Sequence, residues 1–147
     1  MRHFRLAVSL IAIAVVSTAC IEEPTVVSLT NADVAGSYSL RAVNGGALPA
    51  IIQQGIGTQQ KIEILSDQIT VGADGSWSGV ESTRITTPVA NGTPTVETKV
   101  TNTGGTYTVS GRSVYFKDAA AGSGFAVTFS GDAFLLTDGV STYLYSK

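Results

Sequence analysis

The sequence predicts an all-β protein: an antiparallel up-and-down meander that closes into a small β-barrel of about eight strands. Short alternating apolar runs, rich in threonine and serine, recur along the chain. Turn dipeptides such as Asn91-Gly92 and Asp138-Gly139 separate these runs, and nearly all connections are short, so consecutive strands should be neighbours. Closure removes the exposed edges of such a meander. The alternative, a two-sheet sandwich, needs long crossovers that the sequence does not show.

The first residues have the three parts of a secretory signal. Arg2 and Arg5 give a positive start, Leu6–Val16 an apolar centre, and Ser17–Ala19 a small-residue cleavage site. We therefore expect residues 1–19 to be a signal peptide and the protein to be exported. The apolar run is too short to span a membrane comfortably.

Cys20, the only cysteine, follows this segment directly. The stretch resembles a bacterial lipoprotein signal, in which the first mature residue is a diacylglyceryl-modified cysteine. The resemblance implies a lipid attached at Cys20, which would be the protein's contact with a membrane. It also implies a place in the bacterial cell envelope, on the periplasmic face of the outer membrane or at the cell surface. Ser17 stands where the family usually has an aliphatic residue, and the alternative is ordinary cleavage that releases a soluble protein.

Loss of the signal changes the charge balance. Arg2 and Arg5 leave with it, so seven Lys and Arg face eleven Asp and Glu. The only histidine, His3, leaves as well. An acidic domain without a basic patch offers no electrostatic basis for binding nucleic acid. With a single cysteine there is no internal disulfide, so packing alone must hold the fold.

Residues 20–33 are expected to form a flexible tether, and residues 34–147 the domain. Glu22, Glu23 and Pro24 disfavour regular structure at the start of the tether. Residues 30–33 have the spacing of a capping box, which predicts a single helical turn just before the first strand.

The β pattern contains one change of parity. Ile62 and Ile64 share a face, whereas Ile69 and Val71 lie on the opposite parity, which predicts a bulge within residues 65–68. Gly104-Gly105 is expected to bend the chain between two strands. The expected strands cover residues 37–42, 62–71, 76–86, 95–101, 106–110, 113–117, 125–129, 133–137 and 142–145.

One connection, residues 44–60, is long and has an apolar centre that includes Leu48, Ile51, Ile52 and Ile56. Long loops in compact domains are usually functional or packed on themselves. The aliphatic side chains are expected to plug one mouth of the barrel or to form a lid over a ligand. If exposed, they would form an interaction patch.

The segment Val34–Leu40 (VAGSYSL), the Asn44-Gly45 and Leu48-Pro49 pairs, and the Ala-Asp-Gly and Thr-Tyr-Thr-Val-Ser-Gly segments resemble bacterial lipocalin-like domains. The resemblance covers residues 34–147. Tyr38 stands where lipocalins have the tryptophan of Gly-x-Trp. The family packs a late arginine across that aromatic, and here Lys147 is the only basic residue near the end. The resemblance implies an eight-stranded calycin-type barrel that binds a small hydrophobic molecule.

Strand parity suggests which side chains would line a cavity, although most large side chains in a domain of this size must form the core. The expected wall residues are Tyr38, Leu40, Ile64, Trp77, Val109, Phe116 and Val127.

Catalysis is not expected. The mature chain has no histidine and Cys20 would be acylated, so neither a Cys–His nor a Ser–His pair is available. The carboxylates fall mostly in turns or on polar strand faces, and their spacing selects no pair. Zinc lacks ligands, and neither a phosphate loop nor a cofactor motif is present. We expect a non-enzymatic binding barrel without metal or cofactor. The alternative is a protein-interaction module, an inhibitor or an envelope assembly factor, with a packed core and contacts through loops 44–60 and 87–94.

Overall fold

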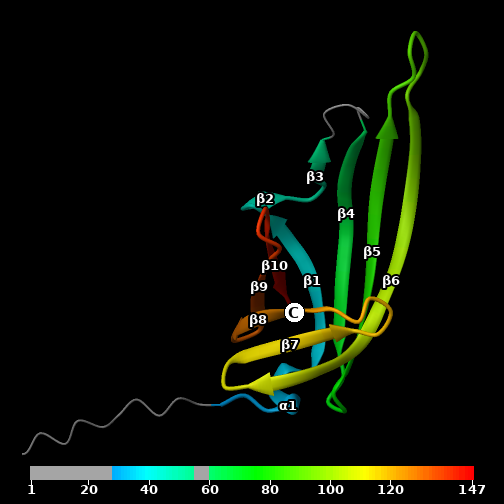
Figure 1. Cartoon of the computed structure of the whole chain (residues 1–147). Helices are drawn as coiled ribbons and strands as arrows, with labels where there is room; N and C mark the ends of the chain where they lie inside the picture. The colour runs from blue at the N-terminus through cyan, green and yellow to red at the C-terminus, as the bar shows by residue number, and fades with distance from the viewer. Residues whose placement is uncertain (1–27, 55–59) are drawn as a thin grey trace, which may run out of the picture.

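The chain folds into a closed antiparallel β-barrel of eight strands with two extra short strands, which confirms the predicted fold class (Figure 1). The structure is a computed structural model that describes residues 28–54 and 60–147. The elements are α1 (Asn31–Val34), β1 (Gly36–Val43), β2 (Gly46–Ala47), β3 (Ala50–Gln54), β4 (Lys61–Val71), β5 (Ser76–Thr87), β6 (Thr95–Ser110), β7 (Ser113–Asp118), β8 (Gly124–Ser130), β9 (Ala133–Thr137) and β10 (Thr142–Ser146).

The barrel closes between its first and fourth strands. From β4 to β10 each strand pairs with the next along the chain, and β10 pairs with β1. β1 then pairs with β4, with residues 36–39 opposite residues 68–71. β2 lies on β1, and β3 lies on the part of β4 that β1 does not reach. A closed ladder satisfies the backbone groups that an open meander would leave at its edges.

The residues just before the barrel are held by hydrogen bonds. Thr30 caps α1, and its side chain and that of Asp33 form the predicted capping box. The Leu29 N–H donates to the Gly111 carbonyl at 2.9 Å, so Leu29, within the predicted tether 20–33, is hydrogen-bonded to the turn between β6 and β7. The signal segment 1–19 and Cys20 lie outside the described residues. Within residues 28–54 and 60–147, no helix has the length and apolar character needed to cross a membrane.

The helical turn α1 closes one end of the barrel, because its last residue is buried and accepts a hydrogen bond from a side chain of β1. Val34 has no exposed surface, and the Tyr38 hydroxyl donates to the Val34 carbonyl at 2.8 Å. The Tyr107 hydroxyl donates to the Gly72 carbonyl at 2.6 Å. Figure 1 shows α1 across the lower opening.

Aromatic side chains fill the barrel next to α1. The Tyr38 ring lies 5.4 Å from Phe129 and 5.3 Å from Phe134, and Phe134 stacks on Tyr145 at 4.8 Å. Phe116 is fully buried beside them. These separations are typical of favourable aromatic pairs. On the other side of Tyr38, the Lys147 Nζ lies 5.2 Å from the ring centroid and therefore packs across it.

The predicted bend at Gly104-Gly105 is wrong, since β6 runs without interruption from Thr95 to Ser110. Both glycines permit close contact between neighbouring strands. A Cβ on Gly105 would overlap the Lys117 carbonyl oxygen, and one on Gly104 would lie 3.0 Å from the Trp77 carbonyl oxygen. The glycine pair is thus needed where β6 lies very close to its neighbouring strands, and it does not form a turn.

The long loop predicted over residues 44–60 is also wrong in part, because it contains β2 and β3. The Ile51 side chain is 51% exposed, whereas Leu48 and Ile52 pack partly buried against the core. Ile56 lies outside the described residues. The described part of the apolar centre is therefore a short strand added to β4.

Candidate functional site

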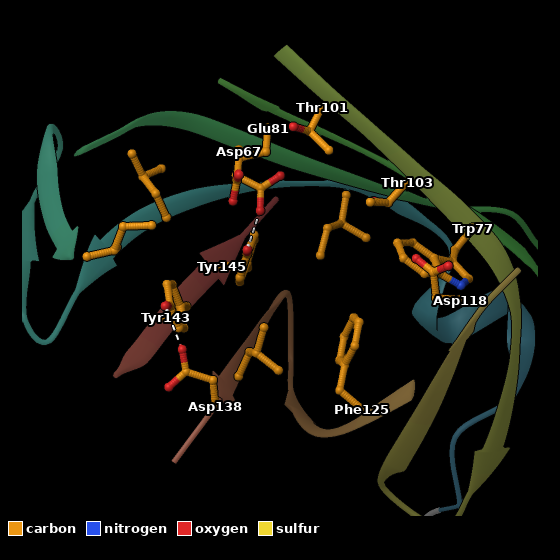
Figure 2. Close-up of a pocket in the computed structure, with 14 residues that line it drawn as sticks. Asp67, Trp77, Glu81, Thr101, Thr103, Asp118, Phe125, Asp138, Tyr143 and Tyr145 are labelled. Atoms are coloured by element: carbon orange, nitrogen blue, oxygen red, sulfur yellow. Dashed lines mark hydrogen bonds between the residues drawn. The ribbon is translucent and has the colours of Figure 1, made fainter. Parts of the chain in front are cut away.

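A cavity of about 300 Å³, partly open to solvent, lies inside the barrel. Its lining includes Trp77 and Phe125, at the aromatic core (Figure 2), and also Ile52 and Ile64, where β3 pairs with β4. Ile69 and Leu136 complete its apolar lining. The volume is at the lower end of the range for small-molecule sites.

The polar lining consists of acidic and hydroxyl side chains. In addition to the apolar residues, the cavity is lined by Asp67, Glu81, Thr101, Thr103, Asp118, Asp138, Tyr143 and Tyr145. Four of these are carboxylates, and none of the fourteen lining residues is Lys, Arg or His. The cavity therefore combines an apolar body with a negative potential.

A bulge in β4 directs Asp67 into the cavity. The register against β5 shifts between Ile64 and Ser66, which confirms the bulge predicted within residues 65–68. Before the bulge Ile64 faces inward, and after it Asp67 and Ile69 do. Because successive strand residues point to opposite faces, the bulge alone brings Asp67 inward.

Asp67 and Glu81 face each other across neighbouring strands. They are direct partners in the β4–β5 register, so their side chains leave the sheet on the same face. The Tyr145 hydroxyl donates to Asp67 Oδ2 at 2.5 Å (Figure 2). Burial raises the pKa of Asp67 above its usual range, and the Tyr145 hydrogen bond offsets part of that rise. Burial and the negative charge of Asp67 raise the pKa of Tyr145 strongly.

Glu81 has no fixed partner. Within the described residues its carboxylate accepts no hydrogen bond and forms no ion pair. Burial raises its pKa and Asp67 raises it further, while Lys99 on β6 acts in the opposite direction. The negative charge of Glu81 also raises the pKa of Tyr143 and of Tyr145 on β10. Glu81 thus presents to the cavity a carboxylate that has no hydrogen-bond or ion-pair partner among the described residues.

The other two carboxylates have clear roles in turns. Asp138 Oδ1 accepts from the Val140 and Ser141 N–H groups at 2.8 and 2.7 Å, and Oδ2 accepts from the Tyr143 hydroxyl at 2.8 Å. These backbone hydrogen bonds lower the pKa of Asp138. Burial and the Asp138 contact raise the pKa of Tyr143 to about 12. Asp118 Oδ1 accepts from the Ala120 and Ala121 N–H groups, both at 2.7 Å.

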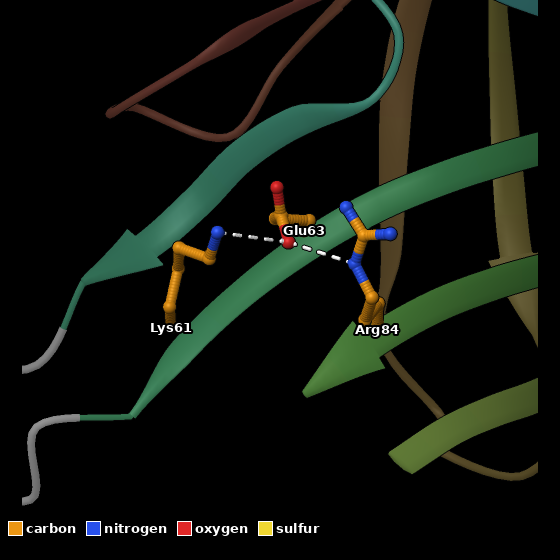
Figure 3. Close-up of polar contacts among 3 residues, drawn as sticks. All are labelled: Lys61, Glu63 and Arg84. Carbon is orange, nitrogen blue, oxygen red and sulfur yellow. Dashed lines mark hydrogen bonds and ion pairs between the residues drawn. The ribbon is translucent and has the colours of Figure 1, made fainter. Parts of the chain in front are cut away.

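Two nearby basic side chains, Lys61 and Arg84, belong to the outer face of the sheet, whereas Lys99 on β6 lies opposite Thr83 and therefore on the same face as Glu81. Lys61 Nζ and Arg84 Nε lie 3.2 and 2.9 Å from Glu63 Oε2 (Figure 3). Glu63 is a direct partner of Arg84 in the β4–β5 register and precedes the bulge by two positions, on the face opposite Ile64. β4 and β5 therefore carry Glu63, which is paired with two basic side chains, on their outer face, and Asp67 and Glu81 on their inner face.

Only two of the seven predicted wall residues, Ile64 and Trp77, line the cavity. The other five belong to the packed core. Tyr38, Leu40, Phe116 and Val127 are buried there, and Val109 packs against them. Of the four residues assigned to a plug or lid, Ile52 lines the cavity, whereas Leu48 and Ile51 do not.

Sequence reasoning missed the acidic lining, although one signal for Asp67 was present. Asp67 has the same parity as Ile69 and Val71, so once a bulge is assigned before it, the alternation places it inside. The position of Tyr145 beside Asp67 had no such local signal, since the residues are 78 positions apart.

The fold and the site define a class: a closed eight-stranded antiparallel barrel with an internal, acid-lined cavity next to an aromatic core. No protein-family model, curated protein or solved structure matches the chain.

Proposed function

We propose that this protein is a non-enzymatic binding barrel of the bacterial cell envelope that holds a small, largely apolar molecule in its cavity. The observation that supports the proposal is the 300 Å³ cavity itself, which opens to solvent and has six large apolar side chains in its wall. Burial of apolar ligand surface there would contribute about 25 cal/mol for each Å² removed from water. The Lys147 side chain across Tyr38 further supports the lipocalin-like resemblance.

The same proposal includes export and a lipid anchor at Cys20, supported by the charged, apolar and small-residue parts of segment 1–19. Cys20→Ser should abolish attachment to membranes, because the hydroxyl cannot form the thioether. Mass spectrometry of the N-terminus and fractionation of envelopes would measure both. Recovery of unmodified wild-type protein in the soluble fraction would contradict the anchor.

Binding is favoured over catalysis by the geometry of the carboxylate pair. Carboxylates that cleave glycosidic bonds flank the scissile bond from two sides. Asp67 and Glu81 leave the sheet side by side from one wall, so they do not flank a bond from two opposite sides. They can instead act together on one charged group.

The cavity can be tested by filling it. Thr101 lines the cavity from β6, and Thr98 lies on the outer face of the same strand opposite Arg84. N-phenyl-1-naphthylamine, a neutral apolar dye, should show saturable fluorescence enhancement with the wild type. Thr101→Phe should reduce its affinity about tenfold or more, and Thr98→Phe, the matched control, should leave it unchanged. Uptake that is absent in the wild type, or equal in both variants, would overturn the proposal.

A second candidate, the protein-interaction module, is favoured by the free edge of β6. Residues 95–104 pair with β5 on one side and have no strand partner on the other among the described residues. Gly104 accepts from Ala119 on the β7 side, so residues of the same parity, such as Val100, turn their backbone groups to that edge. Val100 is 58% exposed. An added strand could pair there.

Replacement of one edge residue distinguishes this candidate. Val100→Pro removes an outward N–H without breaking the ladder to β5, and Val100→Thr is its control. Loss of a defined crosslinked complex from membranes with Val100→Pro alone would support the interaction module. An unchanged complex would exclude the edge as the contact.

A further inference from the structure

The charge of the cavity points to the chemical class of its ligand, an inference that rests on the proposed function. The apolar wall of the cavity does not discriminate between ligands by their charge, but the polar wall does. Carboxyl and hydroxyl groups line it, and a cationic side chain is absent from all fourteen lining residues. An anionic ligand would meet like charge there, whereas a cation would meet opposite charge at short range and in reduced dielectric.

We propose that the cavity selects a small organic cation, an ammonium or guanidinium group carried on a compact apolar body, with the cation between Asp67 and Glu81. The register places these two carboxylates directly opposite each other on one wall. Figure 2 shows both projecting toward the space that Tyr145 borders, while Trp77 and Phe125 lie toward its other end. The apolar body lies against those two rings.

The folded protein by itself leaves this pair poorly compensated. Like charges directly opposite on neighbouring strands are destabilising. Asp67 has one hydroxyl donor, Tyr145, and Glu81 has none among the described residues. Burial raises the pKa of both groups, so the fold resists their ionisation. A cation bound between them would offset the repulsion that the fold retains.

The surroundings of the pair allow an ammonium group to approach. Lys99 on β6 lies on the same face as Glu81 and lowers its pKa, but within the described residues it forms no ion pair, and it is not among the lining residues. The other groups around Glu81 are Asp67 on β4, Thr101 on β6, and Tyr143 and Tyr145 on β10, all acidic or neutral. The hydroxyls can accept hydrogen bonds from an ammonium in addition to the carboxylates.

Three probes with one rigid apolar body separate charge from shape: 1-aminoadamantane, 1-adamantanol and 1-adamantanecarboxylate. Trp77 is the only tryptophan of the chain and lines the cavity, so its fluorescence reports occupancy in the full chain. At pH 8 and low salt the amine should bind at least about tenfold tighter than the alcohol, equivalent to about 1.4 kcal/mol. The alcohol should in turn bind more tightly than the carboxylate. Added salt should weaken the amine more than the alcohol.

Variants test whether the pair is responsible. Glu81→Gln and Asp67→Asn keep the shape of each side chain, and each should reduce the preference for amine over alcohol about threefold or more while leaving alcohol binding unchanged. Glu97→Gln removes the same charge from an exposed position on β6 outside the cavity lining and should change nothing.

The possible failures are distinguishable. Equal affinity for amine and alcohol, or a preference that survives both cavity variants, would overturn the cation inference and leave the apolar binding site intact. If none of the three probes changes Trp77 fluorescence and the neutral dye is also excluded, the proposed function fails together with the inference.

Discussion

Glu81→Gln should stabilise the protein at neutral pH, because it removes one of two like charges that the fold holds opposite each other. Asp67 and Glu81 are direct cross-strand partners, and pairs at such positions contribute roughly 0.2–1 kcal/mol. We expect a gain in the free energy of unfolding of that size, or about 1–5 °C in Tm for a domain of this length. The glutamine amide keeps the volume of the side chain, so packing around Ile69 and Trp77 should not change.

The gain should depend on pH in a definite direction. Burial and the Asp67 charge raise the pKa of Glu81 in the folded state above its unfolded value. The folded protein therefore holds this proton more tightly, and stability is lost as the pH rises from the ordinary glutamate range, about 4, through the raised value. Glu81→Gln should thus be more stable than the wild type at pH 8 and equal to it near pH 3.

Urea unfolding of wild type and variant at pH 8 and pH 3, monitored by Trp77 fluorescence and by circular dichroism, measures this difference. High salt at pH 8 should reduce the gain, because screening weakens the repulsion. A variant that is less stable than the wild type at pH 8, or one whose gain is the same at both pH values, would refute the reasoning. A stabilised variant with weakened amine binding would show that the acid is kept for function at a cost in stability.

Three further predictions concern the fold around the site. Tyr38→Phe should lower the free energy of unfolding by about 1–3 kcal/mol in urea titrations, because it leaves the buried Val34 carbonyl without its hydroxyl donor. Arg84→Met should destabilise the protein at neutral pH, since Arg84 lowers the pKa of Glu63; that difference should disappear as the pH falls through the lowered value, as measured by thermal unfolding across pH. Gly105→Ala should sharply reduce thermal stability, because its Cβ would overlap a carbonyl oxygen of β7.

Each of these has a matched control. Tyr143→Phe removes a hydroxyl whose hydrogen bond is exposed and should cost less than Tyr38→Phe. Lys61→Met removes the longer of the two contacts to Glu63 and should have a smaller effect than Arg84→Met. Gly46→Ala places a Cβ at 3.4 Å from its nearest heavy atom and should be tolerated. Equal effects within any pair would show that the named contact is not the cause.

Local patterns were enough to predict much of the barrel. Alternation and turn dipeptides predicted most of the strand segments, and the parity change between Ile64 and Ile69 located the bulge. Local patterns gave wrong predictions where the same residue type can serve two different structural roles. Gly104-Gly105 suggested a turn, but the pair serves close contact with neighbouring strands that no local pattern describes. The long apolar segment 44–60 contains β3 because β4 extends beyond β1 and has an unpaired side to which a strand can add.

The sequence by itself determined the class of fold and the helical turn at its start, because these follow from periodicity and capping. The tertiary structure decided where the cavity lies and what lines it. Parity assigns a side chain to the inside of a barrel, but it cannot distinguish a packed inside from a hollow one. That distinction depends on where α1 and the aromatic rings end and on how β4, β5 and β10 bring Asp67, Glu81 and Tyr145 together from distant parts of the chain.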